Sequence, residues 1–546
     1  MKSYSDQLSV GRRNFLAKAS GVVFSAIGLD FLAPQGGVAK GMEAMRAKGL
    51  VKNSRAHQAY EIRRRAAQYQ RDLPLAKQET NGDEDLYPNR IGNYSKGLPR
   101  DAYGDVDPDA FEAMLVALRT SRPEDFERIP LGGALKLTNP QAAFAYELEG
   151  PDSHHVSIRV PPAFNSAQQA GEIAELYWQA LLRDVSFNEY GMHPLTNEAA
   201  VELSKWLDFS GPIQNNGVSP STLFRGATPG DLDGPYVSQF LWKDVPYGST
   251  PIIQKIRTAR PGIDYLVDYG EWLTVQRGFV GRKNQFDPTP RYIRSGRDLS
   301  RYVQVDQLYT AFLNAGLILL GMGAPLNRGN PYRTSKNQIG FATFGAPSVL
   351  DLVARVANCS LKAAWYQKWL VHRKARPEEF AGRVHNHITG AKKYPLPQGI
   401  FDSAVPEKVF QRYESYLLPV AYPEGCPTHP AYPAGHAVIA GACATVLKAF
   451  FDESYQIRDP VVASSDGLSL VPYRGELSVG GELDKLASNI SIGRNFAGIH
   501  WRSDYTGGME LGEAVALGVL RDMRECFNEQ FEGFVLTKFD GAKISV

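Results

Sequence analysis

Residues 429–450 read HPAYPAGHAVIAGACATVLKAF, with two histidines seven residues apart around a Pro-Ala-Gly turn. The apolar residues that follow recur at helical spacing and predict a helix from about residue 435 to 452 (Ile439, Ala442, Cys443, Val446, Leu447 and Phe450). Gly435 and His436 then stand at the N-terminus of this helix, where free backbone N–H groups and the helix dipole favour an anion. Taken alone, His429 and His436 are better interpreted as ordinary loop histidines.

Helical periodicity extends outward from this stretch over most of the chain, and strand-like alternation is scarce, with HHVSIRV (154–160) as one case. Further helices are predicted near residues 109–118, 169–187, 306–322, 348–373 and 505–526. The predicted fold class is mainly α: stacked helical bundles, in two four-helix-bundle-like units, with long connecting loops and few short strands.

The N-terminus carries the features of an export signal. Arg12-Arg13, then Phe15-Leu16 and an apolar run ending near Ala33, resemble a twin-arginine signal, which we place at residues 1–35. The run is short for a membrane span, and a basic, surface-bound amphipathic helix is the alternative. We therefore expect export to the periplasm or the extracellular space of a bacterium, with no stable membrane insertion of the mature chain. Residues 36–105 are predicted to form an extended arm, and residues 106–546 the helical-bundle domain.

Composition sets the limits on partners and covalent chemistry. The 546 residues carry a formal net charge of +2, with 43% hydrophobic and 22% charged residues, which gives no general argument for binding nucleic acid. Any anion site must therefore come from a local cluster of Lys and Arg. The four cysteines lack zinc-site spacing and are too few for a disulfide framework, although one or two bridges remain open.

Two more segments concentrate basic residues and histidines. In KWLVHRKARP, Lys368, His372 and Arg376 are four residues apart, so on one continuing helix they would share a face, and Pro377 predicts that the helix ends near Arg376. A solvated helix end is the alternative for this segment. In GRNFAGIHWRSD, residues 493–504, Arg494 and His500 are six residues apart, and Asp504 would orient Arg494 or cap the next helix. A capped helix start with a structural histidine is the alternative.

Taken in order, these three segments resemble the active-site signature that vanadium-dependent haloperoxidases share with the type 2 phosphatidic acid phosphatase superfamily. Within that superfamily they are most similar to the bromoperoxidases of red algae and cyanobacteria. The narrower match is carried by the eight-residue Lys–Arg spacing, the histidine seven before His436, and FAGIHWRSD. The upstream segments LTNPQAAFAYELEGPD and AELYWQALLRDVSF are also similar, so the resemblance runs from about residue 90 to 530.

The resemblance implies a cofactor, vanadate, and a role for each site residue. Lys368, Arg376, Gly435 and Arg494 would hold the vanadate oxygens, and His500 would bond vanadium through one ring nitrogen while an acceptor holds the other. Asp504 would support these residues without contacting the vanadate itself. His436 would be the acid–base group that takes a proton from hydrogen peroxide, so the catalytic pair is His436 and His500. His429 and Trp365 match the halide side and favour bromide over chloride.

The implied reaction is the oxidation of bromide or iodide by hydrogen peroxide to hypohalous acid, which halogenates small organic acceptors. No haem or flavin is expected, and homo-oligomers are common in the family. One position departs from the family, which usually has Ser where this chain has Ala434, so we expect weaker or differently tuned vanadate binding. Two alternatives remain open: phosphate-ester hydrolysis on the same scaffold, and a non-catalytic anion-binding protein.

Overall fold

The computed structural model describes residues 54–206 and 208–546. The predicted export signal lies outside the described residues. The described α-helices are α3 (Arg55–Asp72), α4 (Asp83–Leu86), α5 (Pro108–Thr120), α6 (Pro123–Phe126), α7 (Ala167–Leu182), α8 (Pro194–Leu203), α9 (Tyr269–Gln276), α10 (Gly296–Tyr302), α11 (Thr310–Gly321), α12 (Ala346–Tyr366), α13 (Pro377–Thr389), α14 (Gly399–Asp402), α15 (Val405–Tyr413), α16 (Gly435–Phe450), α17 (Val479–Phe496) and α18 (Arg502–Arg524).

The other regular elements are short. Four 3₁₀ turns and one π turn are η1 (Pro140–Phe144), η2 (Ser153–His155), η3 (Phe187–Glu189), η4 (Gln239–Leu241) and η5 (Gln367–His372), the last being the π turn. Three antiparallel strand pairs are β1 (Val245–Tyr247) with β2 (Thr250–Ile252), β3 (Val461–Ala463) with β4 (Leu470–Pro472), and β5 (Val535–Thr537) with β6 (Lys543–Ser545). The mainly α prediction is confirmed, but HHVSIRV forms a 3₁₀ turn and irregular chain instead of a strand.

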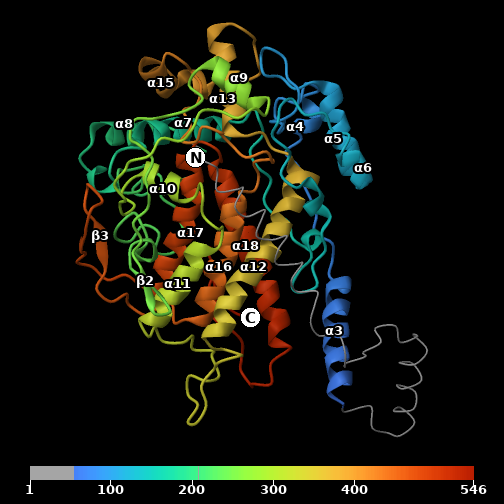
Figure 1. Cartoon of the computed structure of the whole chain (residues 1–546), viewed down its shortest axis with the longest axis vertical. Helices are drawn as coiled ribbons and strands as arrows, with labels where there is room; N and C mark the ends of the chain where they lie inside the picture. Colours follow the sequence, from blue (N-terminus) through green and yellow to red (C-terminus); the bar gives the residue numbers. More distant parts are fainter. Residues whose placement is uncertain (1–53, 207) are drawn as a thin grey trace, which may run out of the picture. The chain divides into compact units, whose positions relative to one another are not determined.

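The centre of the fold is a bundle of α12, α16, α17 and α18, with α16 in contact with the other three (Figure 1). Every residue of α16 except His436 is buried, so this helix is apolar and enclosed on all sides. Helix α17 was missed in the sequence, although Leu483, Leu486 and Ile490 carry helical spacing.

Small residues bring α16 and α18 into close contact. A side chain at Gly512 of α18 would meet the Val438 carbonyl oxygen at 1.9 Å, and one at Gly441 of α16 would meet the Met509 carbonyl oxygen at 2.2 Å. Because both close contacts are made with rigid backbone, only glycine fits at either position. This packing places the N-terminus of α16 beside the first turn of α18.

A second group of helices surrounds α7, which packs against α8, α14, α15 and α17. Helix α7 is buried almost throughout and carries buried carboxylates, Glu172 and Glu175. Both reach the start of α18: Glu175 pairs with Arg502, and Glu172 accepts hydrogen bonds from Ser503. Charged residues on this buried helix therefore fix the segment that follows His500.

Part of the predicted N-terminal arm lies inside the fold. Tyr94, Lys96 and Leu98 are fully buried, and Lys96 pairs with Glu378 of α13 at 2.8 Å. A buried ammonium needs such a carboxylate partner, which ties this part of the arm to the interior. The chain divides into two compact units, residues 1–68 and 69–546. The arm residues named above belong to the second unit.

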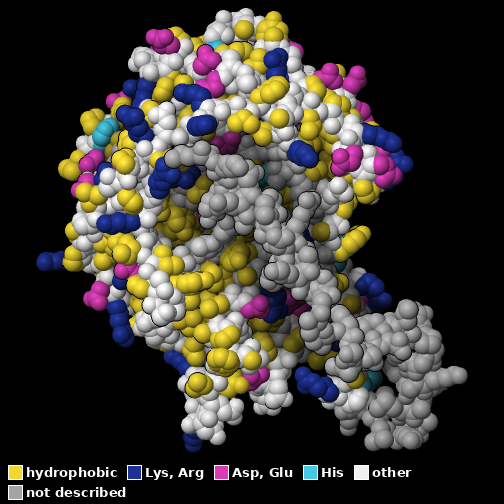
Figure 2. All heavy atoms as spheres, viewed as in Figure 1, with side chains coloured by type: hydrophobic (Ala, Val, Ile, Leu, Met, Phe, Trp, Pro, Cys, Tyr) yellow, Lys and Arg dark blue, Asp and Glu magenta, His cyan; other side chains and the backbone are white. Residues whose placement is uncertain are grey.

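The surface and the cysteines complete the description. On the face shown in Figure 2, charged side chains of both signs are interspersed, and hydrophobic side chains gather below the centre. None of the four cysteines forms a disulfide, so neither of the bridges left open by the sequence forms. None of the helices in the described parts of the chain combines the length and apolar character needed to cross a bilayer.

Candidate active site

Four helix ends meet at one end of the central bundle. The C-terminal ends of α12 and α17 and the N-terminal ends of α16 and α18 lie there, together with the start of α13. These ends carry all the predicted site residues: Trp365, Lys368, Arg376, His429, Gly435, His436, Arg494, His500 and Asp504. Residues up to 139 positions apart in sequence therefore form one cluster.

Lys368 and Arg376 lie on two different helical segments. Helix α12 gives way to the π turn η5, the chain reverses at Arg373 (φ 40°), and Arg376 is the N-cap of α13. The helix does not continue to Arg376, so Lys368 and Arg376 do not share a helix face, and Pro377 starts a new helix as its first residue. The π turn buries Lys368 completely, and its ammonium donates to the carbonyl oxygens of Pro430 and Ala431, both at 2.8 Å.

Arg376 contacts both His429 and His500. Its guanidinium donates to the Ile499 carbonyl at 2.8 Å and to the His429 carbonyl at 2.9 Å. It also lies 2.8 Å from His500 Nε2 and 3.0 Å from His429 Nδ1. Because a guanidinium can only donate, His500 Nε2 accepts, and the neutral His500 ring carries its proton on Nδ1. His429 Nδ1 lies between this donor and an acceptor, the Pro430 carbonyl oxygen at 3.1 Å.

The tautomer of His500 is fixed from both sides. Its Nδ1–H donates to Asp504 Oδ2 at 2.7 Å, so Nε2 presents a lone pair toward the basic side chains. Burial, and after it Arg376 and Lys368, holds the pKa of His500 well below its ordinary value. Asp504 also accepts from the Trp501 backbone N–H at 3.1 Å and so caps α18. Asp504 thus orients His500 and not Arg494.

His436 pairs with a carboxylate that was missed in the sequence. Its Nε2–H donates to Asp306 Oδ1 at 3.0 Å, which leaves Nδ1 as the basic nitrogen. Burial lowers the pKa of His436 below 6.5, Asp306 opposes this shift, and Arg494 and Lys368 add to it. Asp306 lies before α11 in VQVDQLYT, where no spacing relates it to His436, so only the fold reveals the pair.

Arg494 comes from the last turn of α17. One guanidinium nitrogen donates to the Val303 carbonyl at 2.6 Å, and the guanidinium lies 5.5 Å from the centre of the Tyr422 ring. Its Nε is buried without a hydrogen-bond partner. A buried charged donor left unpaired is costly, which indicates a site built for an additional acceptor.

The basic cluster of Lys368, Arg376 and Arg494 has no carboxylate in ion-pair contact among the described residues, although Asp504 and Asp306 lie close enough to act on its charge. Within the described residues, no Asp or Glu oxygen lies within 4 Å of any of these three side chains, although all three are buried. Burial, followed by the charge of Arg376, holds the pKa of Lys368 well below its ordinary value. A bound anion would stabilise the protonated form of Lys368 and supply the missing charge.

The first turn of α16 adds backbone donors to the same place. Its N-cap, Ala434, is fully buried and has no side chain that could accept a hydrogen bond. Among the described residues, no acceptor is found for the N–H groups of Gly435, His436 and Ala437. A Cβ atom at position 435 would contact Trp365 at 3.4 Å. Because glycine has no Cβ, the backbone there remains open to close approach. Three free N–H groups therefore join the basic cluster.

The two residues predicted on the halide side lie together. The rings of Trp365 and His429 are 4.9 Å apart with an angle of 43° between their planes. Trp365 is half-buried and donates to the Thr138 carbonyl at 3.2 Å, while His429 is buried. Burial, followed by Lys368 and Arg376, holds the pKa of His429 well below its ordinary value. The pair is thus an aromatic wall that includes one neutral imidazole.

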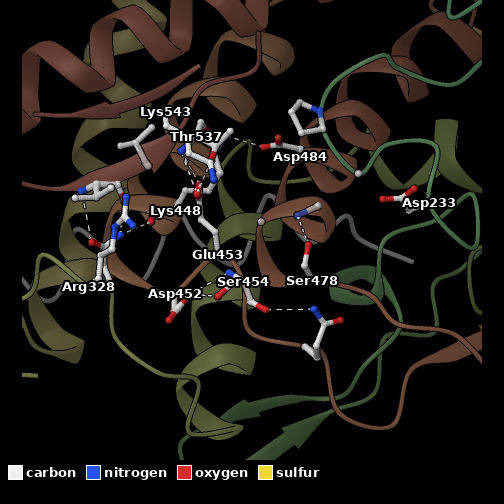
Figure 3. Close-up of a pocket in the computed structure, with 18 of the residues that line it drawn as sticks. Asp233, Arg328, Lys448, Asp452, Glu453, Ser454, Ser478, Asp484, Thr537 and Lys543 are labelled. Atoms are coloured by element: carbon white, nitrogen blue, oxygen red, sulfur yellow. Dashed lines mark hydrogen bonds and ion pairs between the residues drawn. The ribbon is translucent and has the colours of Figure 1, made fainter. Parts of the chain in front are cut away.

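A cavity of about 650 Å³ at the opposite end of α16 provides a contrast (Figure 3). There the buried Lys448 ammonium lies 2.8 Å from Asp484 and donates to the Thr537 carbonyl at 2.7 Å. Asp452 accepts from Ser454 at 2.7 Å. The buried ammonium of this cavity therefore has a carboxylate partner within the chain, unlike Lys368 in the basic cluster.

The comparisons with known proteins agree with this geometry. The chain is 34% identical to the vanadium-dependent bromoperoxidase of Corallina pilulifera, over 90% of this chain and 98% of that protein. It is 35% identical to the vanadium-dependent bromoperoxidase of Ascophyllum nodosum, over 86% and 89%. The chain belongs to the vanadium-dependent bromoperoxidase family.

The structural comparison supports the same family. The homohexameric second vanadate-dependent bromoperoxidase of A. nodosum superposes with a TM-score of 0.84 at 30% identity, covering 97% of this chain and 95% of that one. The family description "VCPO second helical-bundle domain" matches residues 352–529, which contain every predicted site residue. The sequence-based resemblance to vanadium-dependent haloperoxidases is thereby confirmed.

Proposed function

We propose that this protein uses hydrogen peroxide and bound vanadate to oxidise bromide or iodide to hypohalous acid, which halogenates small organic acceptors. The observation that carries the proposal is a buried basic cluster, with no ion pair to a described carboxylate, around an imidazole lone pair and an uncapped helix N-terminus. This set matches a small tetrahedral oxyanion whose central atom also accepts a nitrogen ligand.

The residues present fit vanadate. Lys368, Arg376 and Arg494 would neutralise its oxygens, the N–H groups of Gly435 and its neighbours would approach one of them, and His500 Nε2 would be the vanadium ligand. In the structure Arg376 donates to His500 Nε2, so the guanidinium must give up this hydrogen bond when the nitrogen becomes a ligand. Bound vanadate supplies Lewis-acid activation of peroxide toward halide.

His436 would move the proton in this reaction. Neutral at physiological pH because its pKa is lowered, it can accept a proton at Nδ1 while Asp306 holds Nε2–H. His429 would offer a ring N–H to the halide, with Trp365 as the apolar wall beside it. A weakly hydrated anion such as bromide suits one donor and an aromatic face.

The test compares two activities of one preparation. Purified protein is reconstituted with orthovanadate and assayed for peroxide-dependent bromination, and the vanadate-free protein is assayed for phosphate-ester hydrolysis. Bromination that requires both vanadate and peroxide is the expected result. Hydrolysis without bromination would favour a phosphatase on this scaffold, and neither activity would favour a non-catalytic anion-binding protein.

Assembly and export are part of the proposal. The A. nodosum neighbour is homohexameric, and the hydrophobic area in Figure 2 offers a surface for subunit contact, so we expect a homo-oligomer. Twin-arginine export and a bacterial source rest on residues 1–35 alone, while the relatives come from Corallina and Ascophyllum. Blockage of export by Arg12→Lys with Arg13→Lys would support the signal.

A further inference from the structure

A row of arginines and aromatic rings leads toward the basic cluster. The Arg257 guanidinium lies 4.0 Å from the centre of the Phe286 ring, and the Arg301 guanidinium lies 4.7 Å from the same ring. Farther in, the Arg494 guanidinium lies 5.5 Å from the Tyr422 ring. Three guanidiniums and two rings thus belong to one region of the molecule.

Tyr422 joins the two halves of this row. Its hydroxyl donates to the Ser300 carbonyl at 2.6 Å, and Ser300 immediately precedes Arg301 on α10. Helix α10 packs against α17, which carries Arg494 (Figure 1). The Val303 carbonyl just after α10 accepts the hydrogen bond from Arg494. The contact of α10 with Tyr422 and α17 therefore links the segment that carries Arg301 to Arg494.

Burial increases along the row. Arg257 is exposed, Arg301 is half-buried, and Arg494 is 7% exposed. Within the described residues none of the three has a carboxylate oxygen within 4 Å of its guanidinium, whereas Arg294, just before α10, pairs with Asp298, and Arg297, on α10, pairs with Asp184. The row thus carries positive charge without ion pairs from the surface to the site.

Ring contacts leave these guanidiniums able to bind an anion. A guanidinium that lies on an aromatic ring is held by its face, so the N–H groups at its edge stay free. Arg301 uses one of them to donate to Gln304 at 2.8 Å, and Arg257 donates to no described residue. A guanidinium is also weakly hydrated, which suits a large, weakly hydrated anion better than an ammonium would.

We propose that Arg257 and Arg301, held on Phe286, form an approach site that gathers halide anions and passes them toward Arg494. The inference rests on the proposed function, since a halide peroxidase needs its anionic substrate concentrated at the site. Glu424 is the opposing charge: it accepts from Gln304 at 2.8 Å and lies close enough to act on the charge of Arg301. Arg257 and Arg301 touch no reacting atom and act only through their charge.

The kinetic test removes these charges one at a time. Arg257→Gln and Arg301→Gln should each raise the KM for bromide about threefold, and the double variant about tenfold, with kcat unchanged. Glu424→Gln keeps an acceptor for Gln304 but loses the negative charge, so it should lower the KM. Arg301→Lys, which keeps the positive charge, should have a KM for bromide close to that of the wild type. All differences should shrink at high ionic strength.

Arg328→Gln is the matched control, because this exposed arginine lines the cavity at the opposite end of α16 (Figure 3). Loss of the same charge there should leave the KM unchanged. A KM shift in the control as large as in Arg301→Gln, a fall in kcat equal to the rise in KM, or no change in the double variant would each overturn the approach site.

A readout without turnover separates this inference from the proposed function. Crystals of vanadate-free protein soaked in bromide should show anomalous scattering at the Arg301 guanidinium, and crystals of Arg301→Gln should not. If bromide binds at Arg301 but the reconstituted protein does not brominate, the peroxidase proposal is overturned and the anion site stands. Normal bromination without bromide at Arg301, and with unchanged KM in the double variant, would overturn only the approach site.

Discussion

Two buried carboxylates determine which ring nitrogen of His500 and of His436 carries the proton. Asp504 takes the Nδ1–H of His500 and so turns the Nε2 lone pair toward the basic cluster. Asp306 takes the Nε2–H of His436 and so leaves Nδ1 basic. The two histidines thus use opposite nitrogens, which suits one as a ligand and the other as a proton acceptor.

At the same scale we expect Ala434 to weaken cofactor binding. A serine there would place a hydroxyl at the N-cap of α16, beside the three free N–H groups. One more hydrogen bond to a charged oxyanion should tighten vanadate binding about tenfold to a hundredfold in Ala434→Ser. Calorimetric titration of the vanadate-free protein measures this, with Ala434→Gly as the control without a hydroxyl. Weaker binding in the serine variant would mean that its hydroxyl caps the helix instead.

At the scale of elements, helix α7 fixes the start of α18. Arg502 follows His500 by two residues, is buried, and donates to Glu175 at 2.8 Å. Ser503 donates to Glu172 at 2.8 Å. Because α18 has no N-cap side chain that accepts a hydrogen bond, these carboxylates and Asp504 together determine where His500 stands.

Glu175→Gln tests this role. The substitution leaves the charge of Arg502 buried and unpaired, so it should lower the free energy of unfolding by about 3–5 kcal/mol. Urea unfolding measures the loss. The control is Glu510→Gln on α18, whose partner Arg159 is exposed and whose ion pair should contribute about 1 kcal/mol at most. Equal losses in the two variants would contradict the argument.

At the scale of the whole molecule, buried neutral histidines make stability depend on pH. Burial, followed by Arg373 and Lys374, lowers the pKa of His372 to about 3, and neither ring nitrogen has a hydrogen-bond partner. Because the unfolded chain binds this proton more readily than the folded chain, His372 destabilises the fold as pH falls below about 6.5 toward 3.

His372→Asn should therefore flatten the acid side of the stability curve. From pH 7.5 to pH 5.5 the wild type should lose about 1.4 kcal/mol more unfolding free energy than the variant. Urea unfolding at both pH values checks this, with His154→Asn at a half-exposed position as the control. Parallel losses in wild type and His372→Asn would contradict the assignment.

Much of this could be read from the sequence because the signals were local. Helical spacing around Ile439 predicted α16, and the Pro-Ala-Gly turn predicted that it begins at Gly435. What was missed depends on contacts between distant segments. Asp306 meets His436 across 130 positions, and the burial of Lys96 depends on Glu378. The π turn after α12 likewise follows from packing of the Lys368 segment and not from any local pattern.

The central claim is that His500 holds vanadium while His436 moves the proton, and vanadium content tests it most directly. After reconstitution and exhaustive dialysis, elemental analysis should find vanadium in the wild type and in His436→Ala, which retains the metal but no longer brominates. His500→Ala, with an unchanged circular dichroism spectrum, should retain no vanadium above background. Vanadium retained by His500→Ala at the wild-type level would contradict the account.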